Sequence, residues 1–373
     1  MATVDHWQLP DGIEEVLPER AEAIEGLRRQ LLDLYRGWGY RLVIPPLIDL
    51  DLLTFKLTDQ LSGRALGVRA DITPQVARID AHSLAEEAVT RLCYAGSVLH
   101  SRPQTPQASR SPIQLGAELY GDDSVAADVE IVHLMLATLE AAGLDSITLD
   151  LGHVGIYRAV LAQADLGAEM QRTVFDALQR KSVPDLHVAL EAVDPPVADA
   201  LAGLHGDASV LSRARELFTG FAPDALVALD ALEAVASELR RLHPDLAIYF
   251  DLAELRGYHY HTGLVFAAYV PEYGQALANG GRYNDVGEVF GRARPATGFA
   301  TDLKVLTELS PVKKLPRGVI GIPNTDDPEL AATVRELRAS GEIVVSSLSG
   351  RRDPRCDREL SKVDGRWQIL PLD

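Results

Sequence analysis

The chain has 373 residues, 54 of them acidic and 36 basic, which gives a formal net charge of −18 at pH 7. Nucleic-acid binding usually requires a basic surface, because contacts to phosphates supply most of the non-specific affinity, so a long polyanion is not expected as the main partner. No apolar run is long enough to span a bilayer, and the N-terminus lacks the pattern of a signal peptide. The two cysteines, Cys93 and Cys356, follow no disulfide or metal-binding spacing, so we expect a cytoplasmic protein.

Helical and strand-like patterns alternate through the first 150 residues. Pro18 opens a helical repeat of apolar residues, which ends at Gly37 and Gly39. A later amphipathic helix is predicted over 129–139 and another helix over 77–88. Short strands are predicted at 42–44, 67–69, 92–99, 113–120 and 147–151, with the polar segment 97–111 as an exposed loop.

The second half of the chain begins with a change in composition. Residues from about 164 to 244 are rich in alanine and leucine and nearly free of aromatic side chains, which predicts a helical insertion. We therefore expect a main domain over 1–310 with this insertion, and a small C-terminal module over 317–373. Strand patterns return at 247–250, 264–269 and 298–300, and the module reads as strand 319–322, a helix from Asp327-Pro328, and strand 343–345.

Residues 256–263, with the sequence Arg-Gly-Tyr-His-Tyr-His-Thr-Gly, concentrate planar hydrogen-bonding side chains. Gly257 allows a ligand to approach the backbone, and Arg256 offers a rigid fork that matches a carboxylate. The tyrosine and histidine rings offer flat walls with polar tips. This pattern predicts a pocket for a small, planar, zwitterionic ligand, although a buried aromatic strand with internally satisfied polar atoms would have the same sequence.

Several kinds of catalytic and cofactor site are excluded by their missing motifs. The chain has no phosphate-binding P-loop, no dinucleotide-binding glycine pattern and no nucleophile elbow. His259 and His261 would share one face of a strand, but a third metal ligand is not evident. We therefore expect no cofactor and no metal.

Further segments, in their order and spacing, resemble the catalytic domain of histidyl-tRNA synthetase, a class II aminoacyl-tRNA synthetase, over about residues 9–309. The resemblance implies an α+β fold with an antiparallel sheet flanked by helices, the helical insertion, and a small C-terminal α/β module. The segments that carry it are 39–46, 69–74 with Arg78, Arg102-Pro103-Gln104, 114–118, 256–261, 280–283 and 298–300.

The resemblance also implies an amino-acid pocket. Glu118 and Gln114 lie four residues apart on one strand, so both point to one face. A carboxylate there could accept from an α-amino group or from an imidazole N–H, and Asp71 could accept a second amino proton. An internal salt bridge to Arg78 or Arg256 is the alternative for both acids. The matching positions are Asp71, Thr73, Gln114, Glu118, Arg256, Gly257, Tyr260, His261 and, in an expected turn over 280–283, Gly280, Gly281 and Tyr283.

The departures from the synthetase pattern concern ATP and tRNA. His100 and Lys304 stand where the synthetase has arginines that clamp phosphates, and lysine cannot reproduce a planar bidentate clamp. Asp302 is expected to place a negative charge near the phosphates. Because adenylation depends on such clamps, most of its rate should be lost. The segment after about residue 316 is also too short for a full anticodon-binding domain.

A chain that keeps the histidine pocket but loses these features resembles HisZ, the regulatory subunits of short-form ATP phosphoribosyltransferase. This resemblance implies a non-catalytic subunit in a hetero-oligomer with a short catalytic subunit, which makes phosphoribosyl-ATP in the first step of histidine biosynthesis. It also implies feedback inhibition by L-histidine and a homodimer core built on residues 39–47. An active histidyl-tRNA synthetase with divergent motifs and a free-standing histidine sensor remain as alternatives.

Overall fold

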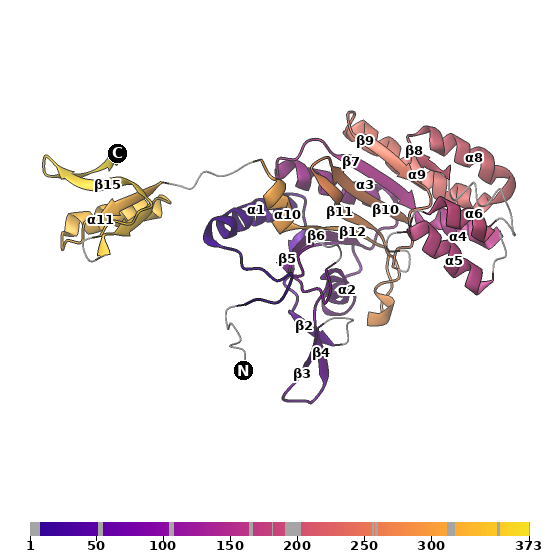
Figure 1. The fold of residues 1–373 in the computed structure, drawn as a ribbon, viewed down its shortest axis with the longest axis horizontal. Coiled ribbons are helices and arrows are strands. Elements are labelled where there is room, and N and C mark those ends of the chain that lie inside the picture. Colours follow the sequence, from indigo (N-terminus) through magenta and orange to yellow (C-terminus); the bar gives the residue numbers. More distant parts are fainter. Residues whose placement is uncertain are drawn as a thin grey trace. The chain divides into compact units, whose positions relative to one another are not determined.

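The structure is a computed structural model that describes residues 8–50, 55–103, 108–163, 167–180, 182–190, 203–255, 257, 260–311, 318–348 and 351–372. Its contacts divide the chain into two compact units, Met1–Val312 and Lys313–Asp373. Within the described residues, no helix is both long and apolar enough to cross a membrane. Figure 1 shows the ribbon of both units.

Nine strands of the described residues form the main sheet of the first unit, in the order β1-β5-β6-β12-β11-β10-β7-β9-β8. The pairs β1–β5 and β7–β9 are parallel, and the remaining central pairs are antiparallel. The strands are β1 (Arg41–Leu42), β5 (Thr90–Ser97), β6 (Ile113–Tyr120), β7 (Thr148–His153), β8 (His205–Gly206), β9 (Ala247–Asp251), β10 (Leu264–Val270), β11 (Tyr273–Arg282) and β12 (Ala296–Asp302).

Helices bury one face of this sheet. α1 (Pro18–Gly37) and α3 (Val125–Ala141) pack against it through a core that includes Leu115, Phe266 and Phe299. On β6, Leu115, Ala117 and Leu119 belong to this core, so Gln114 and Glu118 point to the opposite face. The strand predicted over 113–120 is confirmed as β6. Its side chains alternate between the two faces of the sheet, and such alternation is a strong signal of a strand.

The opposite face carries a smaller core, in which α2 (Thr73–Arg78) packs on Leu92, Tyr94 and Tyr283. The helix predicted over 77–88 is wrong at both ends. Pro74 lies in the first turn of α2, a favoured place for proline, and the chain continues as the π-helix η1 (Ile79–Leu84) to Ala85 at φ 49°. Before α2, a sheet of the described strands β2 (Ile48–Leu50), β4 (Ala65–Val68) and β3 (Lys56–Thr58) leads into it.

The helical insertion begins earlier than the sequence pattern indicated. β7 passes directly into α4 (Val154–Gln163), ten residues before the predicted start at 164, and the short strand β8 joins the edge of the main sheet. The apolar residues of α4 merge with those of β7, so composition alone did not mark the boundary. The other described helices are α5 (Ala168–Gln179), α6 (Val183–Leu190), α8 (Ser209–Phe221) and α9 (Pro223–Leu242).

The second unit is a small α/β module. α11 (Pro328–Ala339) packs its Leu330 and Val334 on a sheet whose described strands run in the order β14-β13-β15-β16. The predicted strand–helix–strand pattern is confirmed as β13 (Val319–Ile322), α11 and β14 (Ile343–Ser346). The last residues of the chain, for which no strand was predicted, form a hairpin of β15 (Cys356–Val363) and β16 (Arg366–Pro371).

Arg282, at the end of β11, forms a buried ion pair that fastens the sheet to α3. Its Nε lies 3.1 and 3.0 Å from the carboxylate oxygens of Asp128, and its Nη1 donates to the Asp122 carbonyl at 3.0 Å. The side chains of Arg282 and Asp128 are only 8% and 10% exposed. A buried pair adds little over an apolar replacement, but removal of one partner leaves a buried charge uncompensated.

We therefore expect Arg282→Ala to lower the free energy of unfolding by about 3–5 kcal/mol, measured by urea titration with circular dichroism. Arg215→Ala, which removes an exposed pair to Asp230 and Glu233, is the control and should change little. An Arg282→Ala variant as stable as the control would show that this pair does not hold β11 to α3.

Candidate functional site

Two neighbouring glycines, Gly298 and Gly281, leave space on the face of the sheet that carries Glu118. Across the strands, Glu118 pairs with Gly298, Gly298 with Gly281, and Gly281 with Val265. The side chain of Glu118 lies directly over Gly298, where any Cβ would overlap its Oε2 atom. Glycine at 298 is therefore required for Glu118 to lie flat on the sheet.

Glu118 is the buried centre of the site, with 1% of its surface exposed. The hydroxyl groups of Thr73 and Tyr94 each donate to its Oε1 at 3.0 Å, and the hydroxyl of Tyr283 donates to its Oε2. Burial raises the pKa of Glu118 to about 8, and the charge of Asp71 adds to this rise, while the hydroxyl donors oppose it. Near neutral pH this carboxyl group therefore holds its proton.

Tyr260 covers this centre from the loop before β10. Its ring stacks on Tyr283 with 4.9 Å between centroids, and burial raises the pKa of Tyr260, with further contributions from Glu118 and Asp71. The Tyr260 hydroxyl is buried and has no hydrogen-bond partner within the part of the chain that the structure describes. A buried polar group without a partner costs about 1–3 kcal/mol, so a polar ligand between Glu118 and Asp71 would satisfy it.

Asp71 and Gln114 form the exposed edge of the same site. The Gln114 amide donates to Asp71 Oδ1 at 2.7 Å, and its carbonyl oxygen accepts from the backbone N–H of Ile72 at 2.8 Å. The backbone N–H of Thr73 donates to Asp71 at 3.0 Å. The two acids thus differ in their surroundings, because Asp71 is solvent-exposed and Glu118 is enclosed by hydroxyl groups.

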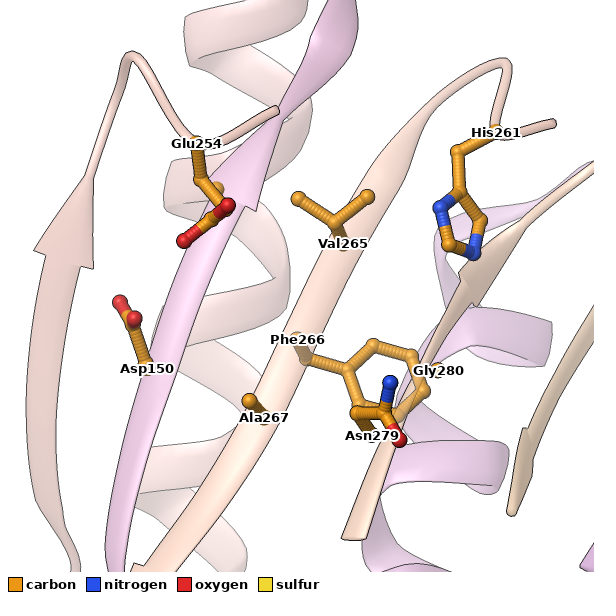
Figure 2. A pocket seen from close by; sticks show the side chains of 9 residues that line it. Asp150, Glu254, His261, Val265, Phe266, Ala267, Asn279 and Gly280 are labelled. Atoms are coloured by element: carbon orange, nitrogen blue, oxygen red, sulfur yellow. The ribbon is translucent and has the colours of Figure 1, made fainter. Parts of the chain in front are cut away.

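His261 lies between two glycines beside this centre. A Cβ at Gly257, where φ is +64°, would come within 2.6 Å of the ring, and one at Gly281 within 2.7 Å. Figure 2 shows His261 at one side of a neighbouring hollow and the carboxylates of Asp150 and Glu254 at the other. The remaining residues that line this hollow are Gly152, Val265, Phe266, Ala267, Asn279 and Gly280.

The structure brings most of the predicted site residues together, with corrections. The turn expected over 280–283 is wrong, because residues 280–282 continue β11. A Cβ at Gly280 would meet the Phe266 ring, so this glycine faces the helix side and only its backbone borders the hollow. Arg256 lies outside the described residues, as do Tyr258 and His259.

Sequence reasoning missed Tyr94 and the acids of the hollow. Tyr94 pairs with Gly116 across β5 and β6, so it lies on the same face as Glu118. The two strands were predicted, but their register was not, and the register is what places Tyr94. Asp150 lies on β7 and Glu254 beyond β9, and nothing in their local sequence indicated that they would meet.

The residues predicted to replace the phosphate clamps bind other parts of this chain. His100 Nε2 lies 3.1 Å from the Ala70 carbonyl oxygen. Lys304 is 4% exposed, and its Nζ lies 3.2 Å from Glu14 and 3.4 Å from the Ser111 hydroxyl. Both side chains therefore make contacts within the first unit.

The expectation that Asp302 presents a negative charge to phosphates is wrong. Its carboxylate accepts from the backbone N–H groups of Lys304 at 3.0 Å and Ile113 at 3.2 Å, which caps α10 (Leu303–Leu309). Burial raises the pKa of Asp302. Over the described residues, no group of three or more histidine, cysteine, aspartate or glutamate side chains could hold a metal ion.

Comparison with known proteins first defines the class. Residues 12–306 match the family described as histidyl-tRNA synthetase, and residues 317–370 match the C-terminal domain of the ATP phosphoribosyltransferase subunit HisZ. A histidyl-tRNA synthetase from Nostoc, 17% identical, has the same fold, with a TM-score of 0.79 over 98% of this chain and 97% of that one. The first unit thus has the class II synthetase-like fold that was predicted.

More similar relatives give the family. ATP phosphoribosyltransferase regulatory subunits of Pseudomonas fluorescens and Ectopseudomonas mendocina are 52% and 53% identical over the whole of both chains. A Bacillus halodurans structure described as an ATP phosphoribosyltransferase regulatory subunit/histidyl-tRNA synthetase is 27% identical, with a TM-score of 0.83 over 94% of this chain and 95% of that one. This chain belongs to the family of ATP phosphoribosyltransferase regulatory subunits, and it is a non-catalytic subunit of that enzyme.

The raised pKa of Glu118 predicts how stability depends on pH. A carboxyl group whose pKa is raised in the folded state contributes stability that is fully present below its unfolded pKa of 4.5 and is lost as pH rises through about 8. Glu118→Gln removes this titration. The free energy of unfolding of the parent should therefore fall relative to that of the variant between pH 5 and pH 9, by urea titration. A difference that does not change with pH would contradict the assigned state of Glu118.

Proposed function

We propose that the pocket around Glu118 binds L-histidine as the feedback effector of ATP phosphoribosyltransferase. The observation that carries this proposal is a buried carboxyl group, ringed by hydroxyl groups, beneath an exposed carboxylate–amide pair. Glu118 and Tyr260 supply hydrogen bonds at the closed end, and Asp71 and Gln114 supply them at the open end. A small amino acid with a polar ring matches both ends.

The difference between the two ends favours one orientation of histidine. An ammonium group is permanently charged near neutral pH and strongly hydrated, so its full burial would be costly. Asp71 is exposed and linked to Gln114, and can receive the ammonium group while water remains nearby. The imidazole ring then lies against Glu118, beside the Tyr260 ring, which is stacked on Tyr283. The resemblance to the synthetase assigns the carboxylate of histidine to Arg256.

Assembly is the second part of the proposal. The relatives' name implies a catalytic partner, and we infer a hetero-oligomer with a short catalytic subunit, built on a homodimer of this chain in the cytoplasm. Leu42, Ile44 and Leu47 support the homodimer, because they are 47%, 81% and 51% exposed in the segment that resembles the dimer element of the synthetase. Exposed apolar side chains that lie close together in a chain are typical of an interface.

The function is tested by mixing this chain with a short-form catalytic subunit and measuring phosphoribosyl-ATP formation with and without L-histidine. Histidine should inhibit the mixture and not the catalytic subunit alone. Glu118→Ala should assemble and activate normally but raise the histidine concentration for half inhibition by at least about tenfold, because losing a buried hydrogen-bonded contact costs about 1.5–3 kcal/mol. Glu216→Ala, an exposed glutamate of α8, is the matched control. If Glu118→Ala remains as sensitive as this control, the effector site lies elsewhere.

The homodimer is tested separately. Ile44→Glu places a charge where the proposed interface requires an apolar side chain, so the variant should elute as a monomer in size-exclusion chromatography with light scattering. Val227→Glu on α9, where the parent valine is 73% exposed, should leave the dimer intact. A dimer that persists in Ile44→Glu at micromolar concentration would place the self-contact on another surface.

A further inference from the structure

Groups on several helices, strands and loops surround Glu118 and influence its protonation state. Thr73 of α2, Tyr94 of β5 and Tyr283, which directly follows β11, provide hydroxyl groups, which can donate or accept. The other titratable or charged groups of this region are Tyr120 on β6, Tyr260 and His261 on the loop before β10, Asp71 before α2, and Asp80 on η1.

The described arginines of this region have other partners. Arg69 donates from Nε to the Ser97 carbonyl oxygen and from Nη1 to the Pro45 carbonyl oxygen, both at 2.8 Å. Arg294 binds Asp80 at 3.2 Å, and Arg282 faces Asp128 on the other side of the sheet. Arg78 on α2 is also engaged within the chain, and Arg256 lies outside the described residues. Burial beside a second acid, Asp71, therefore favours the protonated form of Glu118 in the free protein.

We propose that Glu118 enters the complex with its proton and shares it with the ring of the bound effector. The O–H bond of the Glu118 carboxyl breaks and an N–H bond forms on the unprotonated ring nitrogen, which leaves a carboxylate paired with an imidazolium. At neutral pH no proton enters or leaves the site. This inference rests on the proposed function and states how the same pocket recognises its ligand.

The surroundings suit such a pair. A buried ion pair is stable only where further hydrogen bonds satisfy its remaining donors and acceptors. The hydroxyl groups of Thr73, Tyr94 and Tyr283 already donate to the carboxyl oxygens, and the Tyr260 hydroxyl is free to contact the ligand. A ring that cannot accept the proton would leave the site incompletely satisfied, and sites of this kind reject such analogues strongly.

One shared proton predicts a bell-shaped dependence of affinity on pH. Below about pH 6.5, free histidine already carries a ring proton, so binding must release one proton. Above about pH 8, free Glu118 has lost its proton, so binding must take one up. Affinity should therefore be nearly constant between these limits and fall by up to about tenfold per pH unit outside them.

The test is calorimetric titration of the full-length chain with L-histidine from pH 5.5 to pH 9. Each pH is measured in two buffers of different ionisation enthalpy, which counts the protons exchanged. We expect release at pH 5.5, almost no exchange near pH 7.2, and uptake above pH 8. Affinity that rises through pH 8 with proton release would overturn the proposal, because Glu118 would then bind as a simple carboxylate.

Two variants test whether Glu118 causes the loss of affinity above pH 8. Glu118→Gln keeps a neutral donor of similar shape and should bind more weakly without the loss of affinity above pH 8. Asp71→Asn removes the exposed carboxylate and should keep that loss. If Glu118→Gln still loses affinity above pH 8, the proposal is overturned. If that variant does not fold, the pH dependence of affinity and proton exchange in the parent protein still tests the proposal. Failure of histidine to bind at any pH would instead overturn the proposed function.

Discussion

Placing a carboxyl group inside the protein is the constraint on which this site depends. Glu118 can lie flat on the sheet only because Gly298 has no side chain, and hydroxyl groups from α2, β5 and the residue after β11 donate to its carboxyl oxygens. Burial keeps the group protonated near neutral pH. α2, held by its apolar packing on Leu92 and Tyr94, and the Tyr260–Tyr283 stack lie around this group.

The fold that this chain shares with histidyl-tRNA synthetases carries a different set of side chains at the expected phosphate clamps. The side chains expected at the phosphate clamps are turned inward, with Lys304 bound to Glu14 and His100 to the backbone of Ala70. Asp302 caps a helix. These contacts join the three side chains to other parts of the first unit. They agree with membership in a family of regulatory subunits and with a pocket that acts through its effect on another protein.

Sequence patterns identified many of the strands, but not how the strands pair with one another. β6 was predicted because its residues alternate in character, and the same alternation placed Gln114 and Glu118 on one face. Tyr94 required the register between β5 and β6, which depends on contacts distant in sequence. The start of α2 was missed because its first turn contains Pro74 and few apolar residues. The turn expected over 280–283 came from the resemblance to the synthetase, and residues 280–282 instead continue β11.

The central claim is that the pocket beneath Asp71 and over Gly298 is where histidine binds. A crystal structure of the chain grown with L-histidine near pH 7 tests it most directly. We predict that the imidazole lies within hydrogen-bond distance of Glu118 and the Tyr260 hydroxyl, with the ammonium group at Asp71 and Gln114. Histidine bound elsewhere, for example in the hollow between Asp150 and Glu254, with the Glu118 cluster unchanged, would contradict the account.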